Sequence, residues 1–326
     1  MTRITHVSAS ALAGAPGMLA AAQRELAGHE AVHLRCGDYG PARDAMSPHS
    51  VPISADRNGL EVFKAAVRRA EVLHVHGTLP LFALEWLAES GLARSRPAIY
   101  HAHSFPGEPP LFGDVSEDLG LDWAAKVAVA QAHPRLYPGF RLMPNCLFRR
   151  TLRAGAQPWR HPGSPAMVLF SPSTPAGGRW GRKSSNASAR AWRKLGRLPG
   201  VQTVTVHGWA PERLLALRST AEFGLDEIVT GGFHLVSYET MACGGVAVNA
   251  ADGEAIACLS LGARADEPAP FLHATPATLS AAIGGLVRDP GRLAAWRRAS
   301  HAYFWRWLAP GRVVGLWDAL YREAQA

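Results

Sequence analysis

Residues 231–249 read GGFHLVSYETMACGGVAVN, and this stretch says more about the architecture than any other part of the chain. Its two leading glycines allow a loop to approach a ligand closely, and the run after them predicts a helix. The unpaired N–H groups at the start of such a helix favour an anion such as a diphosphate. Gly244 and Gly245 end the helix before VAVN, which predicts a short buried strand. The stretch therefore predicts a helix and a strand of a parallel sheet, with an anion site at the helix start.

Glu239 falls on the second turn of this predicted helix. A carboxylate at that place can point back toward the ligand and accept hydrogen bonds from paired sugar hydroxyls. An ordinary helix that carries a solvated glutamate is the alternative, and local physics alone leaves both open.

Strand and helix patterns alternate along the whole chain, which predicts an α/β protein with two doubly wound, Rossmann-like domains. In the first half we expect strands at 3–8, 30–34, 72–76 and 98–101 and helices at 17–27, 60–69 and 79–90. In the second half we expect strands at 168–171, 201–207, 221–225 and 246–249 and helices at 186–195, 212–219 and 235–243, followed by helical stretches at 277–287, 292–305 and 312–324.

Prolines accumulate between the two halves, at positions 134, 138, 144, 158, 162 and 165, and predict a connecting region there. We expect one domain over 1–155 and a second over 156–308. Ligands of doubly wound sheets bind beyond the carboxyl ends of the strands, so two such domains face to face would form a cleft for two substrates.

Composition describes a globular chain of 326 residues, with 48% hydrophobic and 18% charged residues. Its start lacks the apolar run of a signal peptide, and no stretch reaches the length of about 18 apolar residues that spans a bilayer. We expect a cytoplasmic protein, with peripheral contact to a membrane surface as an extension of that expectation. The four cysteines form no C-x-x-C pair, so neither a disulfide framework nor a zinc site is expected.

The chain has a net charge of +8, and its charged residues are distributed unevenly along the sequence. No Asp or Glu occurs between Asp122 and Glu212, whereas fourteen Lys or Arg residues do. Such a block attracts polyanions, namely nucleoside diphosphates, anionic lipid surfaces or nucleic acid. A solvated basic face is the plain alternative.

The stretch 231–249 resembles the E-x7-E segment of the retaining GT-B glycosyltransferases of family 4, whose usual form is EGFGLxxxEAMAxGxPVI. The positions in register are Phe233, Leu235, Glu239, Met241, Ala242, Gly244 and Val246. Gly231 stands where the family has its first glutamate, and the proline after the second glycine is missing. Some relatives with glycine at this position share an acidic residue upstream, and Asp226 matches that residue.

The resemblance implies two Rossmann-like domains: an acceptor-side domain (1–155) and a nucleotide-sugar-binding domain (156–308). It also implies that the terminal helix, 309–326, packs back on the first domain. Glu239 would bind the donor ribose, and the helix start would hold the diphosphate. The implied contacts at the helix start are Gly232, Phe233, His234 and Leu235.

Further matches lie in the first domain. His74 and His76 alternate on one face of the strand LHVH, where they are structural or acceptor-side residues. In the segment YHAHS the resemblance implies that His103 is the active-site histidine, and His101 is the alternative. The active-site histidine would donate a hydrogen bond to the donor sugar or the leaving group. The glycine-bearing first loop matches at Gly14 and Gly17, beside the donor phosphates and the acceptor.

In the second domain the family has a basic pair that holds the diphosphate. Here Lys183 matches the lysine and Arg179 the arginine, with Arg182 as its rival. Two fixed cations would neutralise the leaving diphosphate without a metal ion, so no metal and no cofactor beyond the donor are expected. Gly208 and Trp209 end the next predicted strand, where relatives position the nucleobase.

The resemblance thus implies transfer of a sugar from a nucleoside diphosphate donor, of UDP or GDP type, to an acceptor hydroxyl with retention of configuration. A protein of the same fold that binds sugar nucleotides or polyanions without turnover is the alternative. A nucleic-acid-binding module is a third, since Trp159, Trp180 and Trp192 lie within the basic block. The charge would also fit an anionic acceptor: a lipid-linked carrier, a polysaccharide or a modified DNA base.

Overall fold

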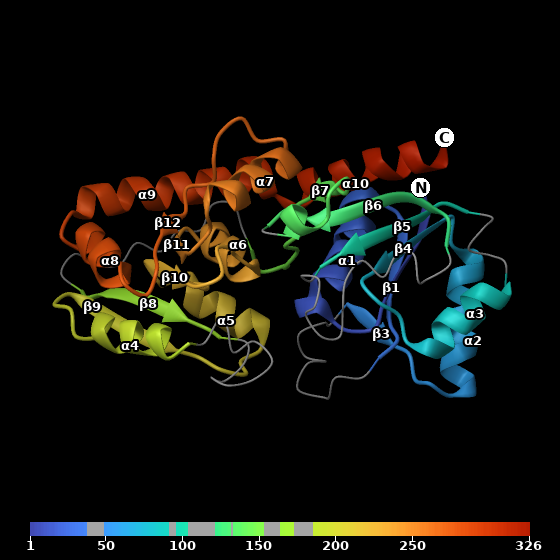
Figure 1. Ribbon diagram of the computed structural model, residues 1–326, viewed down its shortest axis with the longest axis horizontal. Helices are drawn as coiled ribbons and strands as arrows, with labels where there is room; N and C mark the ends of the chain where they lie inside the picture. The colour runs from blue at the N-terminus through green and yellow to red at the C-terminus, as the bar shows by residue number, and fades with distance from the viewer. Residues whose placement is uncertain (38–48, 91–95, 104–120, 132, 153–163, 173–184) are drawn as a thin grey trace. The chain divides into compact units, whose positions relative to one another are not determined.

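The computed structural model describes residues 1–37, 49–90, 96–103, 121–131, 133–152, 164–172 and 185–326. The chain divides into two compact units, one formed by Met1–Phe148 together with Pro310–Ala326 and the other by Arg149–Ala309. Each unit is built around one parallel sheet with helices beside it (Figure 1). The predicted α/β class with two doubly wound domains is confirmed.

The first unit has a seven-stranded sheet in the order β3-β2-β1-β4-β5-β6-β7, and its neighbouring strands pair in parallel. The strands are β1 (Arg3–Ser8), β2 (Glu30–Arg35), β3 (Ser50–Pro52), β4 (Val72–His76), β5 (Ala98–Ala102), β6 (Trp123–Val129) and β7 (Arg141–Met143). The order reverses between β1 and β4. Doubly wound sheets bind ligands at that reversal, beyond the carboxyl ends of the strands.

The helices of this unit are α1 (Ala15–Ala27), α2 (Arg57–Arg69), α3 (Leu81–Ser90) and α10 (Pro310–Gln325). α1 starts after Gly14, which has φ +82°, carries Pro16 in its first turn, and ends at Gly28 with φ +68°. The chain-terminal helix α10 packs against α1 (Figure 1). The Gln23 amide of α1 donates to the Tyr321 hydroxyl of α10 at 3.0 Å.

The second unit has a five-stranded parallel sheet in the order β12-β11-β10-β8-β9. Its strands are β8 (Ala166–Phe170), β9 (Val201–Thr205), β10 (Phe223–Leu225), β11 (Val246–Asn249) and β12 (Leu272–His273). Its helices are α4 (Asn186–Leu195), α5 (Pro211–Arg218), α6 (Leu235–Ala242), α7 (Gly253–Ala263), α8 (Leu279–Val287) and α9 (Pro290–Tyr303), with a π-helical turn at Phe304–Leu308. The helix and strand predicted from 231–249 are α6 and β11.

Five elements lie outside the sequence prediction: β3, β6, β7, α7 and β12. The prolines at 134–165 were interpreted as a connecting region, which is wrong for β7, a three-residue edge strand between Pro138 and Pro144. Proline is tolerated beside such a strand because an edge has one unpaired side. None of the described helices combines the length and the apolar character needed to cross a bilayer.

Candidate functional site

The loop between β10 and α6 is held in shape by Glu227, whose side chain is buried. Its carboxylate accepts hydrogen bonds from the backbone N–H groups of Val229, Thr230 and Gly232 at 2.9, 2.8 and 3.0 Å. It also accepts one from the Thr230 hydroxyl at 2.7 Å. Four donors on one carboxylate fix the path of this loop. The Gly232 amide, which the resemblance assigns to a ligand, is therefore bonded within the loop.

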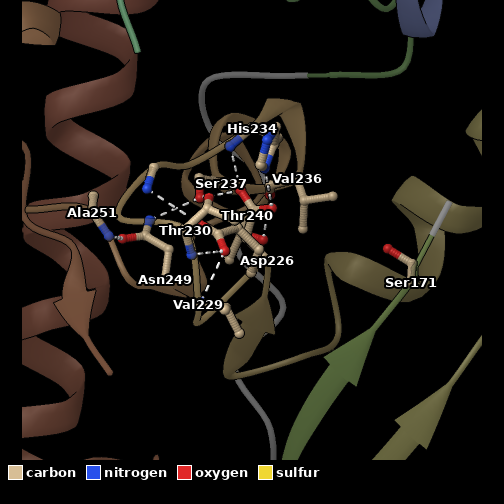
Figure 2. A network of polar contacts seen from close by, with 12 residues as sticks. Ser171, Asp226, Val229, Thr230, His234, Val236, Ser237, Thr240, Asn249 and Ala251 are labelled. Carbon is tan, nitrogen blue, oxygen red and sulfur yellow. Dashed lines mark hydrogen bonds and ion pairs between the residues drawn. The ribbon is translucent and has the colours of Figure 1, made fainter. Parts of the chain in front are cut away.

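Asp226 anchors the start of α6 (Figure 2). Its carboxylate accepts hydrogen bonds from the His234 backbone N–H at 2.5 Å and from the Ser237 hydroxyl at 2.8 Å, and pairs with His234 Nδ1 at 3.0 Å. Burial alone would raise the pKa of Asp226, but the charge of His234 and these hydrogen bonds outweigh it and lower that pKa. Asp226 is thus an ionised anchor, and the half-buried His234 ring is fixed by it.

Glu239 projects from α6 with 13% of its side chain exposed, and its Oε2 lies 3.3 Å from Nη2 of Arg218. Arg218 is fully buried at the end of α5. Its Nη2 also donates to Ser171 Oγ at 2.8 Å, and its Nη1 to Thr240 Oγ1 at 3.2 Å. Ser171 directly follows β8, so the guanidinium ties Glu239 to the carboxyl end of the sheet. A solvated surface glutamate does not fit this geometry.

Gly231 has φ +81°, a conformation that L side chains rarely adopt. A Cβ added there would lie 3.1 Å from Oδ2 of Asp252. A glutamate at this position would therefore be strained and would place its side chain against another carboxylate. The backbone at Gly231 therefore does not suit the glutamate that the resembled segment carries at this position.

Asp252 itself was missed by sequence reasoning. It is the N-cap of α7, where its Oδ1 accepts from the Ala255 backbone N–H at 2.9 Å, and its own N–H donates to the Gly231 carbonyl at 3.1 Å. An Asp-Gly pair that follows a buried strand after two intervening residues is a helix-start signal that would have marked it. A carboxylate thus lies beside the position where the family has its first glutamate.

The other predicted site residues of the second unit either have structural surroundings or lie outside the described part of the chain. Phe233 is buried against Tyr238 and Phe271, with ring centroids 5.9 and 4.9 Å away, so its ring belongs to the core. Leu235 is the first residue of α6. Gly208 is exposed with φ +67°, and the three predicted cations Arg179, Arg182 and Lys183 lie outside the described residues.

Trp209 lies at the strand end where the resemblance implies that the nucleobase binds. The guanidinium of Arg213 lies 3.8 Å from the centroid of its ring, and the ring packs beside a small core cluster of this unit. The contact is a cation–π pair that covers one face of the indole. From the same block, the exposed basic residues on and after α4 are Arg190, Arg193, Lys194 and Arg197.

In the first unit, histidines gather on one side of the sheet. They are His6 on β1, His33 on β2, His74 and His76 on β4, and His101 and His103 on and after β5. The strand register pairs His6 with both His33 and His74, and pairs His76 with His101. We call these six residues the histidine layer. Sequence reasoning noted the alternation on β4 but not the layer, because strand order is needed to align the rows.

Burial keeps the histidine layer neutral at pH 7. It lowers the pKa of His6 to about 4 and that of His103 to about 3, and it lowers the pKa values of the other four well below their usual range. His103 is half-buried, whereas His101 is 2% exposed. His103 Nε2 lies 2.9 Å from His76 Nδ1, so it forms the accessible end of the layer.

The first loop, after β1, has an unusual backbone. Leu12, Ala13 and Gly14 have φ values of +45°, +55° and +82° in succession. Left-handed conformation costs about 1–2 kcal/mol for a residue with a side chain, and such strain gathers at functional sites. Gly17 is buried in the first turn of α1.

Three solved structures share this architecture over nearly the whole chain. HepE of Anabaena, in complex with UDP and glucose, has a TM-score of 0.63 at 13% identity, with 99% of each chain covered. Sucrose-phosphate synthase of Thermosynechococcus elongatus has a TM-score of 0.61 at 15% identity, with 98% of each chain covered. Spinosyn rhamnosyltransferase SpnG has a TM-score of 0.54 at 13% identity, with 97% of this chain and 100% of that one covered. The fold is GT-B. No protein-family profile and no curated protein match the sequence.

Proposed function

We propose that this protein is a glycosyltransferase that moves a sugar from a nucleoside diphosphate donor to an acceptor hydroxyl with retention of configuration. The observation that carries the proposal is Glu239, held by the buried Arg218 at the carboxyl end of a doubly wound sheet. A partly exposed carboxylate fixed in this way suits the paired hydroxyls of a ribose. HepE, with the same fold, was solved with UDP and glucose.

The diphosphate would lie at the start of α6. Asp226 pairs with Nδ1 of His234 at the start of α6, and a protonated His234 ring would add positive charge beside the diphosphate. Lys183 and Arg179, or Arg182 in its place, would add positive charge to the leaving group, so no metal ion is needed at the diphosphate. The exposed cations of α4 favour an anionic acceptor.

The first unit would supply the acceptor side and His103, whose ring would donate a hydrogen bond to the donor sugar or the leaving group. Retention follows from front-face transfer. The new C1–O bond forms on the face from which the diphosphate leaves, and the acceptor proton passes to a diphosphate oxygen. Charge that develops on the leaving oxygens is what the cations and His234 stabilise.

A panel of nucleotide sugars tests the proposal. We expect one donor to release its nucleoside diphosphate in the presence of an acceptor, without added Mg²⁺ or Mn²⁺, and Glu239→Gln to raise the KM for that donor at least about tenfold. Glu212→Gln, at an exposed glutamate of α5, is the matched control and should keep full activity. Release that is equally fast in the Glu239→Gln variant would contradict the proposed ribose contact.

For donor-sugar recognition we propose Asp252, which stands beside Gly231. Asp252→Asn is a clean test because asparagine also caps helices well and should preserve α7. We expect the KM for the sugar nucleotide to rise about tenfold, as for loss of one charged hydrogen bond, with the Kd of the free nucleoside diphosphate unchanged. An equal loss of both affinities would show that Asp252 does not contact the sugar, and Asp226→Asn then becomes the variant to compare.

A further inference from the structure

Three members of the histidine layer lie together at the carboxyl ends of β4 and β5. Each of His76, His101 and His103 offers a ring nitrogen within 4.8 Å of those of the other two. Ligand nitrogens around a tetrahedral metal ion are about 3.4 Å apart when the metal–nitrogen bonds are about 2.0–2.1 Å. The three side chains therefore need to shift by at most about 1.5 Å to reach that spacing.

The hydrogen bonds behind this group fix which nitrogen of His76 faces it. Gln23 Oε1 can only accept, so His6 Nε2, 2.7 Å away, carries a proton. Neutral His6 then accepts at Nδ1 from His76 Nε2–H, 2.9 Å away. His76 is left with a lone pair on Nδ1, directed at His103. Metal-bound histidines commonly donate their other N–H to such an outer partner.

His101 adds the second observation. It is 2% exposed, and its ring is tilted by 45° against that of His103 with the centroids 3.9 Å apart. Neither of its ring nitrogens has a hydrogen-bond partner within the described part of the chain. An unpaired polar group in the interior costs about 1–3 kcal/mol, and buried polar groups without partners call for an explanation. A bound cation would satisfy one of these nitrogens.

We propose that His76, His101 and His103 bind one divalent transition metal ion of the imidazole-preferring class, represented by Zn²⁺. The ligand atoms are His76 Nδ1, His103 Nε2 and one ring nitrogen of His101, and water completes the fourth position. His103, which is half-buried, is the most exposed of the three ligands.

The neighbouring triplet of His6, His74 and His76 is a weaker candidate, although its nitrogens meet the same distance criterion. Both nitrogens of His6 are already bonded, to His76 and to Gln23, and Nδ1 of His74 is bonded to the Tyr321 hydroxyl at 2.8 Å. All three rings are fully buried. An ion at the outer triplet leaves these bonds intact and replaces only the contact between His76 Nδ1 and His103 Nε2.

Metal binding at this site is independent of the proposed transferase activity. Coordination through Nε2 would leave a proton on Nδ1 of His103, which is the form that donates to a sugar hydroxyl. The site and the proposed role of His103 are thus compatible. Because the test below measures bound metal and not turnover, its failure would leave the transferase proposal intact.

The experiment uses the full chain, stripped with chelator, desalted and titrated with Zn²⁺ alone. We expect one Zn²⁺ per chain by calorimetry and elemental analysis, and the visible bands of tetrahedral nitrogen-bound Co²⁺ when Co²⁺ replaces it. His103→Ala and His101→Ala should weaken Zn²⁺ binding at least about tenfold. Gln23→Met removes the acceptor that fixes the tautomer of His6 and, through it, that of His76, and should weaken Zn²⁺ binding by a smaller factor. His207→Ala, at an exposed histidine of the second unit, is the matched control and should bind as the wild type does.

His103 is only half-buried, so the His103→Ala variant should fold, and circular dichroism verifies this. Absence of stoichiometric Zn²⁺ in the wild type would overturn the proposal. So would a folded His103→Ala variant that binds Zn²⁺ as tightly as the wild type.

Discussion

Arg218 is a fully buried cation that touches three polar side chains of the candidate site. A buried guanidinium is costly unless it is paired, and here its partners are one carboxylate and two hydroxyls. Nothing in the sequence around Arg218 marks it, because it lies in an ordinary helical segment. Its position is explained only by the distance to Glu239, which the fold determines.

We expect Arg218→Met to separate positioning from chemistry. Without its partner the Glu239 carboxylate loses its fixed direction, so the KM for the sugar nucleotide should rise at least about tenfold, as for loss of a charged hydrogen bond, with a smaller change in kcat. Arg213→Met is the control, since Arg213 contacts only the Trp209 ring among the contacts described above. Steady-state kinetics on folded variants measures both; an unchanged KM would refute the positioning role.

At the scale of elements, the loop between β10 and α6 is ordered by two carboxylate side chains of its own. Asp226 and Glu227 together accept seven contacts from the loop and the helix start. Acidic residues near a helix N-terminus are stabilised by the helix dipole, and here they also order the backbone. The loop is therefore shaped before any ligand arrives, which lowers the entropic cost of binding one.

Glu227→Gln tests this account of the loop. An amide offers one acceptor oxygen where the carboxylate offers two, and its NH₂ group would face backbone donors. We expect the free energy of unfolding to fall by about 2 kcal/mol, measured by urea denaturation. Glu212→Gln again serves as the exposed control. A loss below about 0.5 kcal/mol, the scale of ordinary surface substitutions, would contradict the account.

Elements with strong local patterns could be predicted from the sequence, and those defined by neighbours could not. The apolar run of β4 and the glycine-bounded α6 were predicted at nearly their observed limits. β12 has only two residues, and its pairing with β11 is what makes it a strand. In the site, Glu239 and His103 follow from motif and strand end, whereas Arg218 and Asp252 depend on contacts between distant segments.

At the scale of the whole molecule, the histidine layer should make the stability of the first unit more sensitive to acid than that of the second. Six histidines of the first unit lie in the layer, whereas the described histidines of the second unit are exposed or half-buried. Histidines whose pKa is lowered by folding stabilise the protein fully above the unfolded value of about 6.5, and that contribution is lost as the pH falls toward the folded value. For His6 this contribution is lost between pH 6.5 and about pH 4.

We therefore expect the metal-free first unit to lose stability on mild acidification. Below pH 6.5 the unfolded chain binds protons that the buried rings do not, so the free energy of unfolding should fall as the pH drops toward 4. Urea unfolding between pH 8 and 4.5 in the presence of EDTA measures the loss, and hydrogen exchange locates it. A free energy of unfolding that changes by less than about 1 kcal/mol between pH 7 and 5 would contradict this expectation.

The helix α10 joins the first unit although more than a hundred and fifty residues separate it from the rest of that unit. During synthesis on a ribosome, the N-terminal segment therefore waits on the order of ten to thirty seconds before the tyrosine that bonds to Gln23 and His74 is made. Until then the nascent sheet lacks the cover that α10 gives to its histidine side. Release or stalling of the chain before residue 310 would leave a half-finished domain, the kind of substrate that chaperones and proteases recognise.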